Sequence, residues 1–224
     1  MLNAFFRELI ETKRYHLLLL ATVLVLVLPA FSGSGLLSEI IFMITMSFLF
    51  IQSMIAAKIK PSRNKWIKYI VITLILITWL KPIGLESIFV DLFKVITFVA
   101  FFVFVVIYLV RYVARSDKVD MNVLITSVNI YLLAGIIGAF LAFFFYRLYP
   151  DAYNFPAYMQ PPVFANFLYY SFITLSTVGY GDITPRIPET QTLAYIISVT
   201  GQLYVAIIIA FIVGKLLAHS DRPS

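Results

Sequence analysis

Long apolar runs, separated by short polar segments, follow one another along most of the chain. A membrane-spanning helix needs about 20 apolar residues, or fewer where flanking lysine and arginine side chains reach the surface. Six runs are therefore predicted to span a membrane: residues 15–31, 37–57, 66–80, 88–113, 121–146 and 190–217. The stretch 162–182, between the last two runs, is predicted to enter the membrane and return. The expected fold is an all-α membrane protein.

The composition agrees with this interpretation. Of the 224 residues, 62% are apolar and 12% are charged, and the mean hydropathy is +0.96, which is far outside the range of soluble globular proteins. The absence of cysteine excludes disulfides and thiolate metal sites. An enzyme is not expected, because no nucleophile–base grouping, metal-spaced cluster or phosphate-binding loop is present. No cofactor is expected either.

The charges predict the orientation in a cell membrane. With the N-terminus in the cytoplasm, all of the 17 lysine and arginine residues fall on the cytoplasmic side except Lys81, Lys94, Arg147 and Arg186. The positive-inside rule therefore favours a cytoplasmic location for both termini. The net charge of +6 follows from this topology, so nucleic acid is not an expected partner, whereas residues 58–68 are basic enough to contact anionic lipids. The first apolar run has two interpretations, a retained helix or a cleaved signal peptide.

Residues 177–182 read T-V-G-Y-G-D, and they carry the candidate chemistry. Gly179 and Gly181 can adopt positive φ without steric cost, so that consecutive carbonyls turn toward one axis while the side chains between them point away. Carbonyl oxygens in this arrangement replace the water around a dehydrated potassium ion. A threonine hydroxyl at the inner end adds another oxygen. The predicted ligands of the transported potassium ion are the carbonyls of Thr177, Val178, Gly179, Tyr180 and Gly181.

The segment 176–182, followed by I-T-P, resembles the filter signature of the tetrameric potassium channels. The alternative is a chance glycine-rich turn. The resemblance implies a pore domain, residues 119–224, with an outer helix, a pore helix at 163–176, the selectivity filter and an inner helix. One chain supplies one filter strand and a closed ring needs four, so a C4 homotetramer is expected. The helix dipole at the end of the pore helix favours a cation there.

Two tyrosines, Tyr169 and Tyr170, stand where relatives often carry two tryptophans. By that resemblance, a phenol from this pair holds Asp182 or Tyr180 and supports the filter. The alternative is a pair of aromatic residues at the level of the lipid headgroups.

The last helix contains two further candidates. Gly201 stands at the spacing from the filter where such channels often carry a hinge glycine, and the alternative is a glycine that permits close helix packing. Four apolar residues share one face of this helix and are predicted to line the cavity and gate it by dewetting, unless they pack against lipid or another helix. They are Val205, Ile209, Val213 and Leu217.

The first four predicted helices, residues 1–118, resemble the sensor domain of six-helix voltage-gated channels in number only. Such sensors carry arginine at every third position of the fourth helix. The basic residues of 89–113, by contrast, are only Lys94 and, at the inner end, Arg111. Moving one charge across the membrane is worth about 2.3 kcal/mol per 100 mV, and steep gating needs three or four charges per subunit. The expected protein is therefore a passive potassium channel without strong voltage gating. Lys94 is expected to pair with Asp91.

Several expectations remain open or concern other parts of the chain. The alternative functions are a potassium transporter subunit, although such proteins usually carry four degenerate filters, and a non-conducting membrane scaffold with a relic pore. The short segment after Leu217 leaves no identifiable ligand-binding domain. Most of the four polar residues within the runs are expected to form interhelical hydrogen bonds. These residues are Gln52, Thr97, Asn122 and Asn129.

Overall fold

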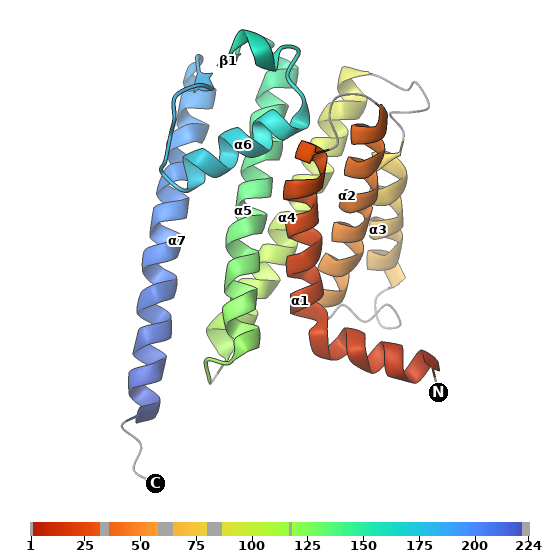
Figure 1. Cartoon of the computed structure of the whole chain (residues 1–224), viewed down its shortest axis with the longest axis vertical. Coiled ribbons are helices and arrows are strands. Elements are labelled where there is room, and N and C mark those ends of the chain that lie inside the picture. The colour runs from red at the N-terminus through yellow and green to blue at the C-terminus, as the bar shows by residue number, and fades with distance from the viewer. Residues whose placement is uncertain (1, 32–35, 58–64, 80–86, 117, 221–224) are drawn as a thin grey trace. The chain divides into compact units, whose positions relative to one another are not determined.

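The structure, a computed structural model, describes residues 2–31, 36–57, 65–79, 87–116 and 118–220. Contacts divide the chain into two compact units, Met1–Val110 and Arg111–Ser224. Helices make up nearly all of the regular structure in the described residues, as Figure 1 shows. The sequence-based boundary at residue 118 lies close to this division. The sensor-like character of the first part stays a prediction.

The first unit is helical in its described residues. Its helices are α1 (Leu2–Phe31), α2 (Leu36–Ala56), α3 (Lys65–Thr78) and the greater part of α4 (Ile88–Arg115). Helix α2 contacts both α1 and α3. This arrangement follows from apolar helices that are joined by short connections.

An aromatic cluster joins α2 to α4 inside this unit. The ring of Phe50 in α2 is fully buried, and it stacks on Phe102 of α4 with 5.3 Å between the ring centroids. Two more rings of α4, Phe98 and Phe101, meet Phe50 edge to face. Such aromatic pairs add to the stabilisation that burial provides.

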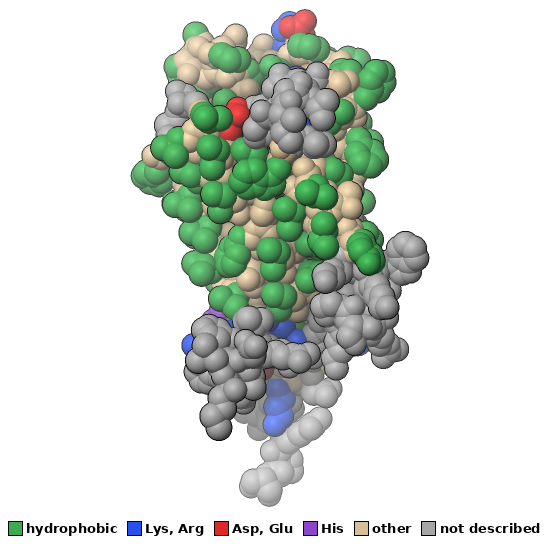
Figure 2. All heavy atoms as spheres, turned by 90° about the vertical axis from the view of Figure 1, so that its right-hand side faces the viewer, with side chains coloured by type: hydrophobic (Ala, Val, Ile, Leu, Met, Phe, Trp, Pro, Cys, Tyr) green, Lys and Arg blue, Asp and Glu red, His purple; other side chains and the backbone are tan. Residues whose placement is uncertain are grey.

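Four helices in the described part of the chain are long and apolar enough to cross a membrane. They are Leu36–Ala56, Ile88–Arg115, Met121–Leu148 and Pro188–Lys215. The predicted first and third spans are helical, but α1 is not among the four and α3 contributes only the shorter apolar segment Tyr69–Thr78. Hydrophobic side chains predominate over the described middle part of the face that Figure 2 shows. The chain is thus a helical membrane protein, and the number six stays a prediction.

The expectation of interhelical hydrogen bonds is wrong for Thr97. Its hydroxyl donates to the carbonyl of Phe93, 2.7 Å away in the same helix. The side-chain amide of Asn129 likewise donates to the carbonyl of Ile125 at 3.0 Å. A carbonyl four residues earlier is within reach of a short polar side chain in any helix, so no second helix is needed.

The second unit carries the candidate site. Its elements after α4 are α5 (Met121–Leu148), β1 (Tyr153–Asn154), the 3-10 helix η2 (Ala157–Met159), α6 (Phe164–Leu175), β2 (Thr184–Pro185) and α7 (Pro188–Ser220). Helix α6 contacts both α5 and α7, and α5 contacts α7. The three helices lie close to the ranges predicted for the outer, pore and inner helices.

Small residues of α5 let α6 approach closely. The hydroxyl of Ser171 in α6 donates to the carbonyl of Gly135 in α5 at 2.7 Å. A Cβ atom added at Gly135 would overlap the ring of Phe172. Glycine at this position therefore lets the Phe172 ring of α6 pack directly on the backbone of α5, near the end of α6 where the candidate site begins.

Candidate functional site

The segment 176–181 leaves the C-terminal end of α6 and stays bound to its last turn. The N–H groups of Ser176, Thr177 and Gly179 donate at 3.0 Å to the carbonyls of Phe172, Thr174 and Ile173, respectively. These bonds fix the start of the segment against α6. The helix end carries a partial negative charge, which favours a cation nearby.

The backbone of this segment has a positive φ at every second residue. The φ angles of Thr177, Gly179 and Gly181 are 61°, 52° and 78°, and no other described residue has a positive φ. Positive φ at alternate residues suits a filter backbone in which successive carbonyls turn toward the same side of the chain. Positive φ was predicted for the two glycines and is confirmed. Sequence reasoning missed the same conformation at Thr177, where a β-branched residue adopts it only when its surroundings impose it.

The two intervening side chains have little contact within one chain. Val178 is 54% exposed and Tyr180 is 72% exposed. Both side chains are therefore free to contact surfaces outside the chain that carries them.

The phenol of Tyr169 donates to Oδ2 of Asp182 at 2.6 Å. The other carboxylate oxygen, Oδ1, accepts the N–H of Ile183 at 3.0 Å. The residue that ends the T-V-G-Y-G-D segment is therefore tied to α6 by a charge-assisted hydrogen bond.

Tyr170 does not share this arrangement. Its side chain is buried, and its ring packs edge to face against Tyr153, with 5.2 Å between the ring centroids. Adjacent residues of a helix point in directions about 100° apart, so only one of the pair can face Asp182. The filter-support role predicted for the pair thus has a structural basis at Tyr169 alone.

Replacing Tyr169 by phenylalanine removes this bond while it keeps the ring. We expect the Tyr169→Phe variant to unfold or dissociate at a lower temperature than the parent in potassium-containing buffer, because Asp182 loses a charge-assisted partner. The matched control is Tyr170→Phe, which removes a buried hydroxyl that does not bind Asp182 and is expected to shift the temperature less. Equal shifts for both variants would contradict the assignment. A thermal melt of the purified protein measures both.

The loop before α6 is tied to the segment that follows the filter. Strands β1 and β2 pair antiparallel, with Asn154 opposite Thr184. The carbonyl of Ala152 accepts the N–H of Arg186 at 2.9 Å and the hydroxyl of Thr190 at 3.0 Å. The outer loop is therefore an ordered support for the chain between Asp182 and α7.

Gly201 lies directly against the end of α6. A Cβ atom added there would overlap the carbonyl oxygen of Leu175 and lie 2.9 Å from its carbonyl carbon. The geometry thus gives Gly201 a packing function, which was the alternative to the hinge. The hinge itself stays a prediction.

Two polar contacts hold α7 on its own unit. The hydroxyl of Tyr204 donates to the carbonyl of Ser127 in α5 at 2.6 Å. Nearer the C-terminus, the ammonium of Lys215 donates to the carbonyl of Ser116 and lies over the ring of Phe211. These contacts fix one face of α7 and leave another uncovered.

The predicted cavity face of α7 is exposed within one chain. Val205, Ile209 and Val213 are all exposed, and the side chain of Leu217 lies outside the described residues. Exposure within one chain does not decide whether these side chains face a water-filled cavity or lipid.

Sequence reasoning missed Gln202, whose exposed side-chain amide lies one helical turn before Val205. Its position in the middle of an apolar helix was the available signal, because polar residues inside membrane helices usually face water or protein.

Comparison with known proteins gives one match. Residues 124–218 match the family model described as "Ion channel". No curated protein and no solved structure matches the chain. The matched range begins within α5 and extends into the last turns of α7, so it contains the whole candidate site. It supports an ion channel function for this part of the chain.

Proposed function

We propose that the protein is a potassium-selective channel that conducts passively through residues 177–181. The alternation of positive φ at Thr177, Gly179 and Gly181 carries this proposal, because it directs carbonyl oxygens to one side of the chain at the negative end of α6. Carbonyl oxygen is a suitable donor for a dehydrated alkali cation. The ion is the transported ligand, and no cofactor takes part.

The channel is proposed to be a C4 homotetramer. One chain contributes one row of carbonyls, whereas an ion needs oxygens all around it. The exposure of Val178 and Tyr180 supports a wall supplied by neighbouring copies. Only 11% of the apolar part of α7 that could span the membrane is buried within one chain. The rest is available for contact with other copies and with lipid.

The inner face of α7 is proposed to line a water-filled cavity. Gln202 lies on the same side of the helix as Val205, Ile209 and Val213, by the spacing of helix positions. A side-chain amide in the middle of a membrane helix is costly in lipid, where its hydrogen-bonding groups have no partner. Water provides those partners, so this side of α7 is expected to face water. The apolar row below Gln202, continued by Leu217, then forms the constriction that closes the pore.

We expect conduction to depend only weakly on membrane potential. Lys94 in α4 forms an ion pair with Asp91 at 3.8 Å, so a movement of this turn carries little net charge. Steep gating would need about three charges per subunit. Conductance measured in planar bilayers should therefore change little between strongly negative and strongly positive potentials. Steep activation with several charges moved per subunit would contradict this prediction.

Two alternatives lead to different observations. A potassium transporter subunit would give flux without unitary currents, and a non-conducting scaffold would give neither.

The proposed orientation has both termini on the cytoplasmic side of a cell membrane and Asp182 on the extracellular side. In this orientation the outer loop faces the extracellular solution, while basic residues near the inner ends contact anionic lipid.

Ion flux into proteoliposomes tests the function. Purified protein is reconstituted and its native mass determined, and uptake of rubidium, sodium and lithium is compared under the same gradient. The proposal predicts the mass of four chains and uptake of rubidium well above that of sodium and lithium. Equal uptake of the three cations, or no uptake by a tetramer, would contradict it.

A further inference from the structure

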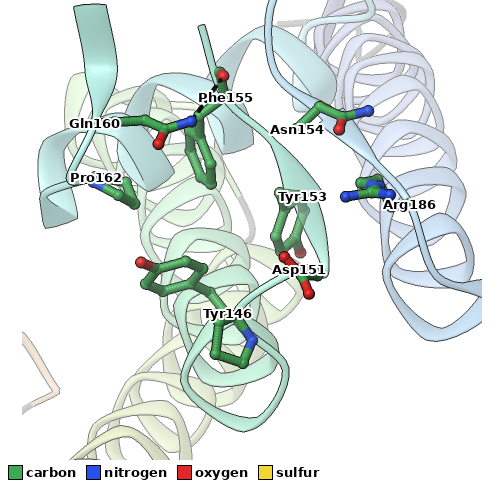
Figure 3. Close-up of a pocket in the computed structure, with 9 residues that line it drawn as sticks. Tyr146, Asp151, Tyr153, Asn154, Phe155, Gln160, Pro162 and Arg186 are labelled. Atoms are coloured by element: carbon green, nitrogen blue, oxygen red, sulfur yellow. Dashed lines mark hydrogen bonds between the residues drawn. The ribbon is translucent and has the colours of Figure 1, made fainter. Parts of the chain in front are cut away.

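We propose that a pocket in the outer loop of the second unit binds a small zwitterion, a molecule with one ammonium and one carboxylate group. The pocket has a volume of about 200 Å³ and lies between the loop that precedes α6 and the segment that follows the filter, as Figure 3 shows. This size suits a molecule smaller than a typical drug, such as a free amino acid or a betaine.

Opposite charges are brought to this pocket by the backbone. Asp151 and Arg186 both line it. They come from distant parts of the sequence. The backbone N–H of Arg186 donates to the carbonyl of Ala152 at 2.9 Å, and this bond holds the two segments side by side. Neither side chain forms an ion pair with another residue that the structure describes. Each charge is thus available to a ligand.

Tyr153 also lines the pocket. Tyr153 is only 4% exposed, and its hydroxyl has no hydrogen-bond partner among the described residues. Burial, and to a smaller extent the neighbouring Tyr170, raises the pKa of Tyr153, so the hydroxyl remains a neutral donor. A buried polar group without a partner is costly, and a ligand that bonds to it removes that cost.

The amides around the pocket are already held in place. The amide of Gln160 donates to the carbonyl of Phe155 at 3.4 Å, and the amide of Asn154 donates to the hydroxyl of Thr184 at 3.2 Å. The pocket wall is therefore organised before a ligand arrives, which reduces the entropy lost on binding.

The pair of charges decides the class of ligand. A simple anion would be attracted by Arg186 and repelled by Asp151. A simple cation would be attracted by Asp151 and repelled by Arg186. A zwitterion satisfies both, with its carboxylate on the guanidinium and its ammonium on the carboxylate. Tyr146 and Phe155 also line the pocket, and their aromatic rings suit a neighbouring ammonium group.

Calorimetric titration of the purified full-length protein tests the proposal without any need for conduction. The probes are L-alanine and glycine betaine, with propionate and tetramethylammonium as single-charge controls. We expect binding of at least one zwitterion and much weaker binding of both controls. Absence of binding by both zwitterions, or equally tight binding of a control, would overturn the proposal while leaving the proposed ion conduction unaffected.

Variants locate the site. Asp151→Asn and Arg186→Gln should each weaken binding of the zwitterion by about tenfold, because each removes one charge-assisted contact. The matched control is Glu189→Gln, which neutralises an exposed carboxylate in the first turn of α7 outside the pocket and should leave affinity unchanged. Tyr153→Phe should raise the unfolding temperature of the empty protein and weaken binding. Unchanged affinity in both Asp151→Asn and Arg186→Gln would overturn the assignment.

Discussion

Replacing Gly179 by alanine is expected to abolish the preference for potassium over sodium while the assembly stays intact. Gly179 has a φ of 52°, and an added Cβ would meet no other atom of the same chain within 4 Å. The defect is therefore conformational: a left-handed residue with a Cβ costs roughly 1–2 kcal/mol, in each of four subunits. The strained peptide is relieved when it rotates, which takes its carbonyl away from the ion.

The measurement is the reversal potential of the reconstituted variant with potassium on one side and sodium on the other. The matched control is Gly214→Ala in α7, where an added Cβ also meets nothing within 4 Å but φ is not positive. Alanine in a helix is neutral or slightly stabilising relative to glycine, so this control should keep its selectivity. Retained selectivity in Gly179→Ala would show that the ion does not depend on this backbone conformation.

Replacing Gly201 by alanine is expected to destabilise the protein strongly. The added Cβ would overlap the carbonyl oxygen of Leu175, and a backbone carbonyl at the end of α6 cannot rotate away as a side chain can. Overpacking of this kind costs about 1–3 kcal/mol per site, and it would push α7 away from the filter. The thermal stability of the purified assembly and the yield of assembled protein should both fall.

The same measurement separates packing from a hinge. Gly214→Ala again serves as the control, because it makes the same substitution in the same helix without a close neighbour. A hinge role alone would leave the stability of Gly201→Ala near that of the control and change only the opening of the pore. That result would contradict the packing account and support the prediction made from the position of Gly201 in the sequence.

Local chemistry explains why much of the second unit was predictable. Glycine is the residue that adopts positive φ most readily, so the conformation of residues 179 and 181 follows from their identity. The start of α6 just after two prolines follows as well, since proline suits the beginning of a helix. Helix α7 begins at Pro188, before the predicted residue 190, for the same reason.

Tertiary contacts explain what sequence reasoning missed. The choice between Tyr169 and Tyr170 as the partner of Asp182 depends on the rotation of α6 about its axis, which the contacts with α5 set. The packing of Gly201 depends on how closely α7 approaches Leu175, a separation that no local pattern encodes. Pairing of β1 with β2 joins segments about 30 residues apart through only two residues each, too few to give a period-two pattern.

The most direct test of potassium selectivity is a single-channel recording of the parent protein in a planar bilayer, with potassium on one side and sodium on the other. If four rows of carbonyls from residues 177–181 coordinate the ion, unitary currents will appear, and their reversal potential will lie far toward that of potassium. A reversal potential near zero with equal concentrations of the two salts would contradict the account, as would flux without unitary currents.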